Sequence, residues 1–262
     1  MQTFPRPFGH LHYRDDGDPA GMPLVFANSL GTDLRLWDDL LPRLPAGLRL
    51  VRFDKRGHGL SSVPPGPYSA EDLAGDAAAL LDALGIRSCV FVGLSIGGLI
   101  AQCLATSRPD LVSALVLSNT AARLGSTELW QARIADIKAH GLAGIADDVM
   151  ERWFAPAFRQ TAAYPAWRQM LINTPQAGYV GCCHALAAAD QRAATARLTL
   201  PTLGIAGSVD GSTPVAVVCD TVESIPGARV EVIEGTGHLP CVEAPDRYAA
   251  LLTTFLADLG PA

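Results

Sequence analysis

The run Gly93-Leu94-Ser95-Ile96-Gly97 has a glycine two residues before and two residues after its serine, and it lies between an expected strand and an expected helix. The apolar run at 89–92 before it is typical of a buried strand, and the run at 98–105 after it has helical composition and stops before Pro109. Glycine has no Cβ, so it tolerates the tight bend that this transition needs. The pattern G-x-S-x-G at a strand-to-helix turn predicts a nucleophile elbow, whereas without that setting it would predict only a turn.

Short apolar runs alternate with helical segments along the chain. This alternation is typical of an α/β fold, with a mostly parallel sheet and helices on both faces. Ser69 and Asp72 have the spacing of a helix N-cap and its capping-box acid, and Gly85 marks the end of that helix. We expect strands at 24–27, 48–53, 89–92, 114–117, 202–206 and 229–233, and a closing helix at 246–259.

The strand pattern disappears between residues 120 and 198, and helical patterns replace it. Apolar stripes predict helices over 130–137 and 142–153, and the stretches 164–172 and 178–189 also have helical composition. A helical block between two strands of an open sheet is expected over the carboxyl ends of the strands, where such folds place their sites. We therefore interpret residues 122–198 as a helical lid, and residues 1–121 with 199–262 as the core.

Composition limits the kind of protein. The 262 residues are 49% hydrophobic and 18% charged, which suits one large globular domain. No apolar stretch approaches the ~18 residues of a membrane span, and the N-terminus lacks the apolar core of a signal peptide. The formal net charge of −6 argues against nucleic acid as a partner, and an anionic ligand would need a local cation. We expect a protein that binds neither a membrane nor nucleic acid.

The cysteines and histidines form no metal-binding pattern. Six cysteines without paired C-x-x-C spacing are typical of reduced thiols, which predicts a cytoplasmic protein. His10 and His12 face one side of an expected strand, but without a third ligand we expect them to be surface strand residues. No glycine-rich phosphate-binding motif occurs. The residues themselves thus predict no metal site and no nucleotide site.

A serine nucleophile needs a base, and the base needs an orienting carboxylate. In folds with a nucleophile elbow these follow in the order Ser, acid, His. Asp210 comes directly after the expected strand 202–206, and His238 comes in the loop after 229–233. We expect Ser95, Asp210 and His238 to form a catalytic triad. Taken singly, Asp210 is also explained as a turn former before glycine, and His238 as an ordinary loop residue.

Other polar residues are less well placed for the triad. Asn119 follows the strand at 114–117, where some relatives of this fold carry their acid, but it is not a carboxylate. Glu234 is too close to its strand, and Glu243 is expected in the final helix. His58 precedes the serine and lies in a glycine-rich turn, so we expect it, with Asp54 and Arg56, to brace the loops near the elbow.

An oxyanion formed at the serine needs two preorganised N–H groups. One is expected from Ile96, directly after the nucleophile, and the other from the loop after an early strand. That loop is Asn28-Ser29-Leu30-Gly31, so Leu30 N–H is the candidate. The alternative is that these residues only form a turn.

Several motifs together resemble the α/β-hydrolase fold family, and more narrowly the 3-oxoadipate enol-lactonases. The loop 54–61 and the elbow are common to the superfamily. Asn-Ser-Leu-Gly at 28–31 and the Gly178-Tyr-Val-Gly-Cys-Cys183 segment are more specific. Further matching stretches are Phe26–Leu34 with Trp37, Ser118–Ala122, Glu151–Phe154 and Gly237–Glu243.

This resemblance implies an enzyme that opens a small anionic lactone with water and needs no cofactor. The carboxylate arm of such a substrate requires a cation, and Arg133 shares the apolar face of an expected lid helix. Arg152 is the next candidate, and Trp130 and Trp153 would wall the pocket. The alternatives are that the stem of Arg133 only covers apolar surface, and that both tryptophans belong to the core.

Two other functions fit the same motifs. A broader esterase or a perhydrolase-type relative would keep the triad but would have no use for Arg133. A binding module on this fold would keep the triad as a ligand anchor and show no turnover. The sequence leaves the oligomeric state open.

Overall fold

Eight strands form one sheet in the order β1-β2-β4-β3-β5-β6-β7-β8 within residues 1–260, the part of the chain that the computed structural model describes. β1 (Gln2–Arg6) and β2 (Gly9–Gly17) are antiparallel, and β2 is antiparallel to β4. The remaining pairs are parallel. The parallel strands are β3 (Met22–Ala27), β4 (Leu48–Phe53), β5 (Cys89–Leu94), β6 (Val112–Ser118), β7 (Thr202–Gly207) and β8 (Arg229–Ile233).

All six strands predicted from apolar runs are present, so the predicted α/β class is confirmed. β4 and β8 have the predicted bounds, and the other four extend slightly beyond theirs. The strand expected around His10 and His12 is β2. β1 was not predicted, and it contains Pro5. Proline is tolerated there because β1 lies at the edge of the sheet, where a missing N–H breaks no ladder.

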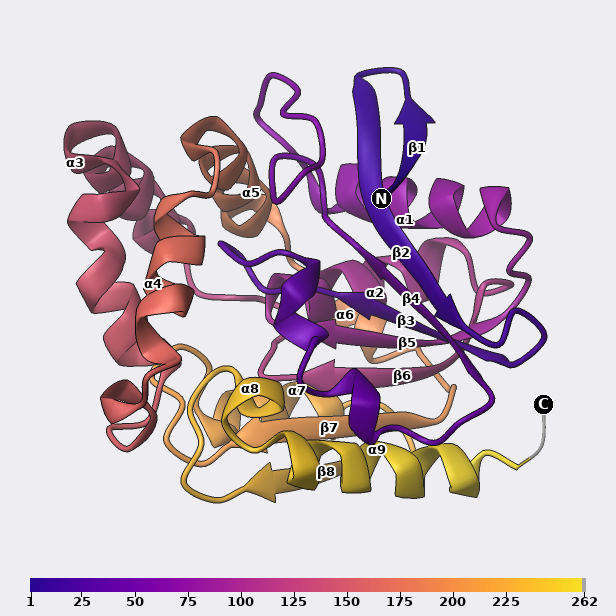
Figure 1. Cartoon of the computed structure of the whole chain (residues 1–262). Helices are drawn as coiled ribbons and strands as arrows, with labels where there is room; N and C mark the ends of the chain where they lie inside the picture. The colour runs from indigo at the N-terminus through magenta and orange to yellow at the C-terminus, as the bar shows by residue number, and fades with distance from the viewer. Residues whose placement is uncertain (261–262) are drawn as a thin grey trace.

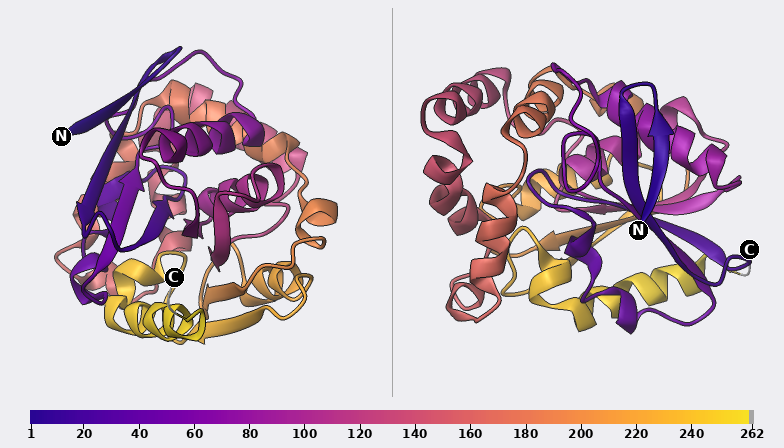
Figure 2. Two further views of the ribbon diagram at one scale, coloured as in Figure 1. Left: turned by 90° about the vertical axis from the view of Figure 1, so that its right-hand side faces the viewer. Right: turned by 45° about the horizontal axis from the view of Figure 1, so that its top comes forward.

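Helices cover both faces of the sheet, as Figure 2 shows. One face carries α1 (Ala70–Ala83), α2 (Ile96–Ser107) and α7 (Val215–Val222), and the other carries α9 (Pro245–Asp258) with the 3-10 helices η1 (Leu34–Trp37) and η2 (Leu41–Arg43). The predicted capping box of α1 is confirmed, with both hydrogen bonds between Ser69 and Asp72 at 3.0 Å. Within residues 1–260, no helix combines the length and the apolar character that crossing a membrane requires.

Within residues 122–198, which we call the helical insertion, the three long helices lie beyond the carboxyl ends of the parallel strands, whereas the short last helix lies back beside α2 (Figure 1). The two predicted helices are both present within α3, where Gly141 (φ +70°, ψ 177°) is non-helical and separates them at a kink. α3 packs against both α4 and α5. The helices of the insertion are α3 (Thr127–Trp153), α4 (Tyr164–Ile172), α5 (Gln176–Ala188) and the short α6 (Arg192–Thr195).

The strand order reverses between β3 and β5, which are neighbours in the sheet. Open α/β sheets place their sites outside the carboxyl ends of the strands at such a point. Ala27, the last residue of β3, pairs with Gly93 of β5. The loop at 28–33 and the turn at Ser95 therefore start side by side, and the loops after β6, β7 and β8 follow along the same edge.

Candidate active site

Ser95 occupies a strained turn between β5 and α2. Its φ is +58°, in the left-handed region that residues other than glycine rarely adopt. Glycine is required on both sides: a Cβ on Gly93 would lie 2.2 Å from Gly97 O, and one on Gly97 would lie 2.1 Å from Ala27 O. The predicted strand–turn–helix is present, with backbone strain of the kind that clusters at functional sites.

Asp210 and His238 follow β7 and β8 and meet at the same edge of the sheet. His238 Nδ1 lies 2.8 Å from Asp210 Oδ2, and both side chains are buried. The carboxylate also accepts hydrogen bonds of 2.6 to 3.1 Å from Ser212 N–H and from the N–H and hydroxyl of Thr213. Burial opposes ionisation, but the charge of His238 and three side-chain hydrogen bonds outweigh it and hold the pKa of Asp210 below its ordinary value. Asp210 is thus an ionised acceptor that fixes the orientation of the imidazole.

Asn119 supports the same carboxylate from the end of β6. Its Nδ2 donates to Asp210 Oδ2 at 2.8 Å and to Gly237 O at 3.3 Å. Its φ of +44° is the second positive value of a non-glycine residue within residues 1–260. The sequence pattern identified Asn119 only as a position where an acid was missing, so this contact was not predicted. A polar residue directly after a central strand was the signal that could have indicated it.

Ser95 and His238 line one cavity of about 190 Å³ under the helical insertion. The imidazole makes its hydrogen bonds to Asp210 and Thr213, and none to Ser95 Oγ. Such contacts are often long in unliganded enzymes and shorten only when a ligand is bound. The structure thus brings together the three side chains that the sequence placed in one triad, with the hydroxyl and the imidazole open to the same space.

Two backbone N–H groups beside the cavity have no acceptor within residues 1–260. One belongs to Leu30 in the loop after β3, and the other to Ile96, the first residue of α2. The first N–H groups of a helix have no partner inside the helix. The neighbouring Gly31 N–H, in contrast, donates to His58 Nε2 at 3.0 Å. Leu30 and Ile96 therefore lie where the sequence predicted two free donors.

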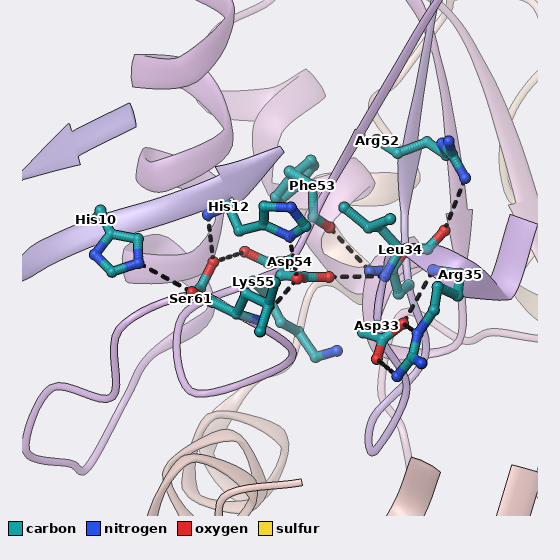
Figure 3. Close-up of polar contacts among 12 residues, drawn as sticks. His10, His12, Asp33, Leu34, Arg35, Arg52, Phe53, Asp54, Lys55 and Ser61 are labelled. Atoms are coloured by element: carbon teal, nitrogen blue, oxygen red, sulfur yellow. Dashed lines mark hydrogen bonds and ion pairs between the residues drawn. The ribbon is translucent and has the colours of Figure 1, made fainter. Parts of the chain in front are cut away.

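The loop after β4 supports the loop after β3 through buried polar contacts (Figure 3). Asp54 accepts from Leu34 N–H at 2.7 Å, and Arg56 binds Asp76 of α1 at 2.6 Å. The predicted bracing role is confirmed for Asp54 and for His58, which accepts from Gly31 N–H, whereas Arg56 attaches the loop to α1 instead. The prediction that His12 lies on the surface is wrong: it is 8% exposed, because its Nδ1 pairs with Asp54 Oδ2 at 2.8 Å.

The four residues predicted to bind substrate all line the cavity. Arg133 and Arg152 are half-buried on α3, and neither forms an ion pair with an acid in the described part of the chain. Trp130 is half-buried and donates its indole N–H to Leu124 O, whereas Trp153 is 5% exposed. Arg152 Nε donates to Asp148 O at 3.2 Å, but neither positive charge has a carboxylate partner in the described part of the chain, so both attract an anion in the cavity.

Glu243 was expected in the final helix, but it ends the separate short helix α8 (Pro240–Glu243) and binds the His238 loop. Oε1 accepts from Gly237 N–H at 2.7 Å, and Oε2 accepts from Ala155 N–H at 2.9 Å. His238 N–H donates in turn to Trp153 O at 2.7 Å. Burial raises the pKa of Glu243 to about 7, although the two N–H donors oppose this shift. The end of α3 is thus attached to the loop of the predicted base.

Known proteins resemble this chain over nearly its whole length. The model of the alpha/beta hydrolase fold family matches residues 22–245. The 3-oxoadipate enol-lactonase 2 of Acinetobacter baylyi is 37% identical over 240 residues, which are 91% of this chain and 90% of the relative.

Two solved structures agree with this result. The enol-lactonase from Burkholderia xenovorans LB400 has a TM-score of 0.94 and 35% identity, covering 98% of this chain and 100% of that one. A hydrolase from Pseudomonas aeruginosa PA01 has a TM-score of 0.93 and 39% identity, covering 97% of each chain. The chain therefore belongs to the α/β-hydrolase fold family, as a hydrolase related to the 3-oxoadipate enol-lactonases.

Proposed function

We propose that the protein hydrolyses 3-oxoadipate enol-lactone to 3-oxoadipate, with Ser95 as nucleophile, His238 as base and Asp210 as orienting acid. The observation that carries the proposal is one cavity that holds Ser95, His238 and the unpaired guanidinium of Arg133. The identity of 37% to a protein named 3-oxoadipate enol-lactonase supports the choice of lactone. In this role the protein acts in the β-ketoadipate pathway of aromatic compound catabolism.

The proposed mechanism has two steps. His238 takes the proton of Ser95 while Oγ attacks the ring carbonyl, and the oxyanion accepts hydrogen bonds from the N–H groups of Leu30 and Ile96. The ring C–O bond then breaks, and the leaving enolate oxygen takes a proton from His238 to give the enol, which tautomerises to the ketone. His238 next removes a proton from water, whose oxygen attacks the acyl ester; the bond between the acyl carbon and Oγ then breaks, and Ser95 Oγ takes the proton back from His238. Apart from the lactone and the attacking water, each step uses only groups of this chain.

We further propose that the helical insertion is a lid that selects the substrate. A guanidinium binds a carboxylate through two parallel hydrogen bonds, so Arg133 is assigned to the carboxymethyl arm and Arg152 is the second candidate. Trp130 and Trp153 supply flat apolar walls. A cavity of about 190 Å³ suits a small ligand of this kind.

A carboxylesterase or perhydrolase-type enzyme with a broader range of substrates is the second candidate. The cavity is lined in part by apolar side chains, among them Leu124, Leu129 and Val149, and these would accept a neutral acyl group. The two functions share Ser95 and His238, and they differ in their need for a cation. Selectivity for an anionic over a neutral ester therefore decides between them.

The test is to incubate the purified protein with the enol lactone, follow the loss of its absorbance, and run a panel of neutral esters beside it. We expect kcat/KM to be highest for the anionic lactone. Ser95→Ala is expected to lower kcat by about a million-fold, as in dissected triads, whereas Ser107→Ala, far along α2, leaves kcat unchanged. Normal turnover by folded Ser95→Ala would exclude the mechanism. Failure of the wild-type protein to turn over any ester would favour a binding module.

A further inference from the structure

The Leu30 N–H belongs to the peptide unit that begins at Ser29. A trans peptide is planar, so its C=O and its N–H point in opposite directions. Ser29 O accepts from Lys55 Nζ at 2.6 Å, and from the hydroxyl and N–H of Thr32 at 3.0 and 3.3 Å. Lys55 and Thr32 do not line the cavity. Because Lys55 and Thr32 hold Ser29 O on the side away from the cavity, Leu30 N–H points toward the cavity.

Lys55 is an unusual donor for this position. It is 2% exposed, projects beside Asp54 from the loop after β4 (Figure 3), and forms no ion pair with an acid of residues 1–260. Its ammonium instead donates to Ser29 O and, at 3.3 Å, to Thr32 O of the same loop. A buried ammonium without a carboxylate partner is costly to the fold, while a charged donor makes a shorter and stronger hydrogen bond than a neutral one.

The next peptide unit is held in the other direction. Gly31 N–H donates to His58 Nε2 at 3.0 Å. Burial and the positive charge of Lys55 lower the pKa of His58 well below its ordinary value, so the ring is neutral and Nε2 accepts. Gly31 N–H is thus occupied, and Leu30 presents the free donor of this loop.

The second free donor is supported only by neutral groups. Ile96 N–H belongs to the peptide unit of Ser95, whose carbonyl accepts from Thr120 Oγ1 at 2.7 Å and from the N–H of Gly98 at 2.9 Å. The two peptide units are therefore held in the same way, through their carbonyls. They differ in that an ammonium acts on one of them.

We propose that Lys55 is a positioning residue that orients and polarises the Ser29–Leu30 peptide unit, which makes Leu30 N–H a stronger donor to an oxyanion at Ser95. A cation beside the carbonyl draws electron density from the amide nitrogen, and this strengthens the N–H as a donor in the same peptide. The inference rests on the proposed function, because Leu30 N–H meets an oxyanion only if Ser95 attacks a carbonyl.

The test uses hydrolysis of p-nitrophenyl acetate, which reports on the oxyanion site whether or not the enol lactone is the substrate. Lys55→Met keeps the length of the side chain and removes every donor. Because loss of a whole oxyanion donor lowers kcat by about 10²- to 10³-fold, we expect a decrease of about 10- to 100-fold here, with KM nearly unchanged. Affinity for phenylboronic acid, which forms a tetrahedral anion on the serine, should fall in parallel. Lys55→Gln restores one neutral donor and should give intermediate values.

Lys138→Met is the matched control, since Lys138 is the other of the chain's two lysines and is exposed on α3. It should leave both kcat and boronate affinity unchanged. The inference is overturned if Lys55→Met folds and keeps both values within about twofold of wild type. If Lys55→Met does not fold, wild-type kcat and wild-type boronate affinity in Lys55→Gln overturn it instead. Activity retained by Ser95→Ala would refute the proposed function, whereas an inactive Ser95→Ala beside a normal Lys55→Met refutes this inference alone.

Discussion

The loops at the carboxyl edge of the sheet and the helical insertion hold their polar groups in opposite ways. At the sheet edge Asp210 is buried and saturated with hydrogen bonds, and Ser95 is held in a strained conformation. On the insertion, Arg133 and Arg152 line the same cavity without an acid partner. Saturated groups keep their positions, while unpaired charges remain free to bind. Under the proposed function, the sheet edge supplies the reacting groups and the insertion selects the substrate.

The two regions are nevertheless joined at one end of α3. His238 N–H donates to Trp153 O at 2.7 Å, and Gly211 N–H donates to Arg152 O at 3.2 Å. Glu243 binds Gly237 and Ala155 together. If the insertion moves as a lid, we expect the motion to leave this end of α3 in place and to involve the part before the kink at Gly141.

The largest effect is expected at the sheet edge, from Asp210→Asn. The variant keeps the shape of the side chain but favours the wrong tautomer of His238, which lowers kcat by about 10⁴-fold in a comparable triad. The measurement is kcat on a neutral ester and on the lactone, which should fall equally. Asp220→Asn, on the exposed side of α7, is the control and should have no effect. A loss confined to one substrate would contradict the division between the two regions.

A substitution in the insertion should instead change KM for one substrate and leave kcat nearly unchanged. Arg133→Met removes hydrogen bonds to a carboxylate, so we expect KM for the anionic lactone to rise about 10- to 100-fold while kcat and the neutral ester change little. Arg152→Met, measured in parallel, determines which arginine binds the arm. Arg168→Met on α4 is the control, because its partner is the exposed Asp147. Equal effects of Arg133→Met on both substrates would remove this residue from the binding role.

The contact between the end of α3 and the His238 loop should make the stability of the protein depend on pH, through Glu243. Its pKa is raised by burial to about 7 from an ordinary 4.5, so between these values the folded protein holds the proton more tightly than the unfolded chain. The contribution of Glu243 to the free energy of unfolding therefore decreases as pH rises from 4.5 to 7, by on the order of 1–3 kcal/mol. Urea unfolding at pH 5 and pH 7.5 should show a flatter dependence for Glu243→Gln. Identical slopes for the variant and the wild type would show that the carboxyl group does not titrate in this range.

The smallest effects come from two helix caps, one in the core of the fold and one in the insertion. Ser69→Ala removes the capping box of α1, and Ser126→Ala removes the cap of α3, where Ser126 Oγ accepts from Leu129 N–H. Each should cost about 1 kcal/mol. Ser69→Ala should lower the global free energy of unfolding, whereas Ser126→Ala should mainly speed hydrogen exchange in the first half of α3. A uniform global loss from both variants would mean that the insertion and the core unfold as one unit.

Local patterns predicted most of the strands, the cap of α1 and the turn at Ser95. These depend on residues close together in the chain, such as the glycines beside Ser95 or the Ser69–Asp72 pair. The order of Asp210 and His238 after successive strands was also enough to place them at one edge, because parallel strands end on the same side. His12 and Glu243 were misplaced for the converse reason, since Asp54, which binds His12, and Ala155, which binds Glu243, are far away in the sequence and have no fixed spacing from them.

By itself the sequence determined the α/β alternation, the bend that presents Ser95, and the positions of Asp210 and His238 after their strands, because each follows from local geometry and chain order. Only the tertiary structure decided which groups hold these residues. Asn119 reaches Asp210 across 91 positions, and Glu243 reaches Ala155 across 88. Such hydrogen bonds depend on how several elements pack together, and this packing produces no repeating pattern in the sequence.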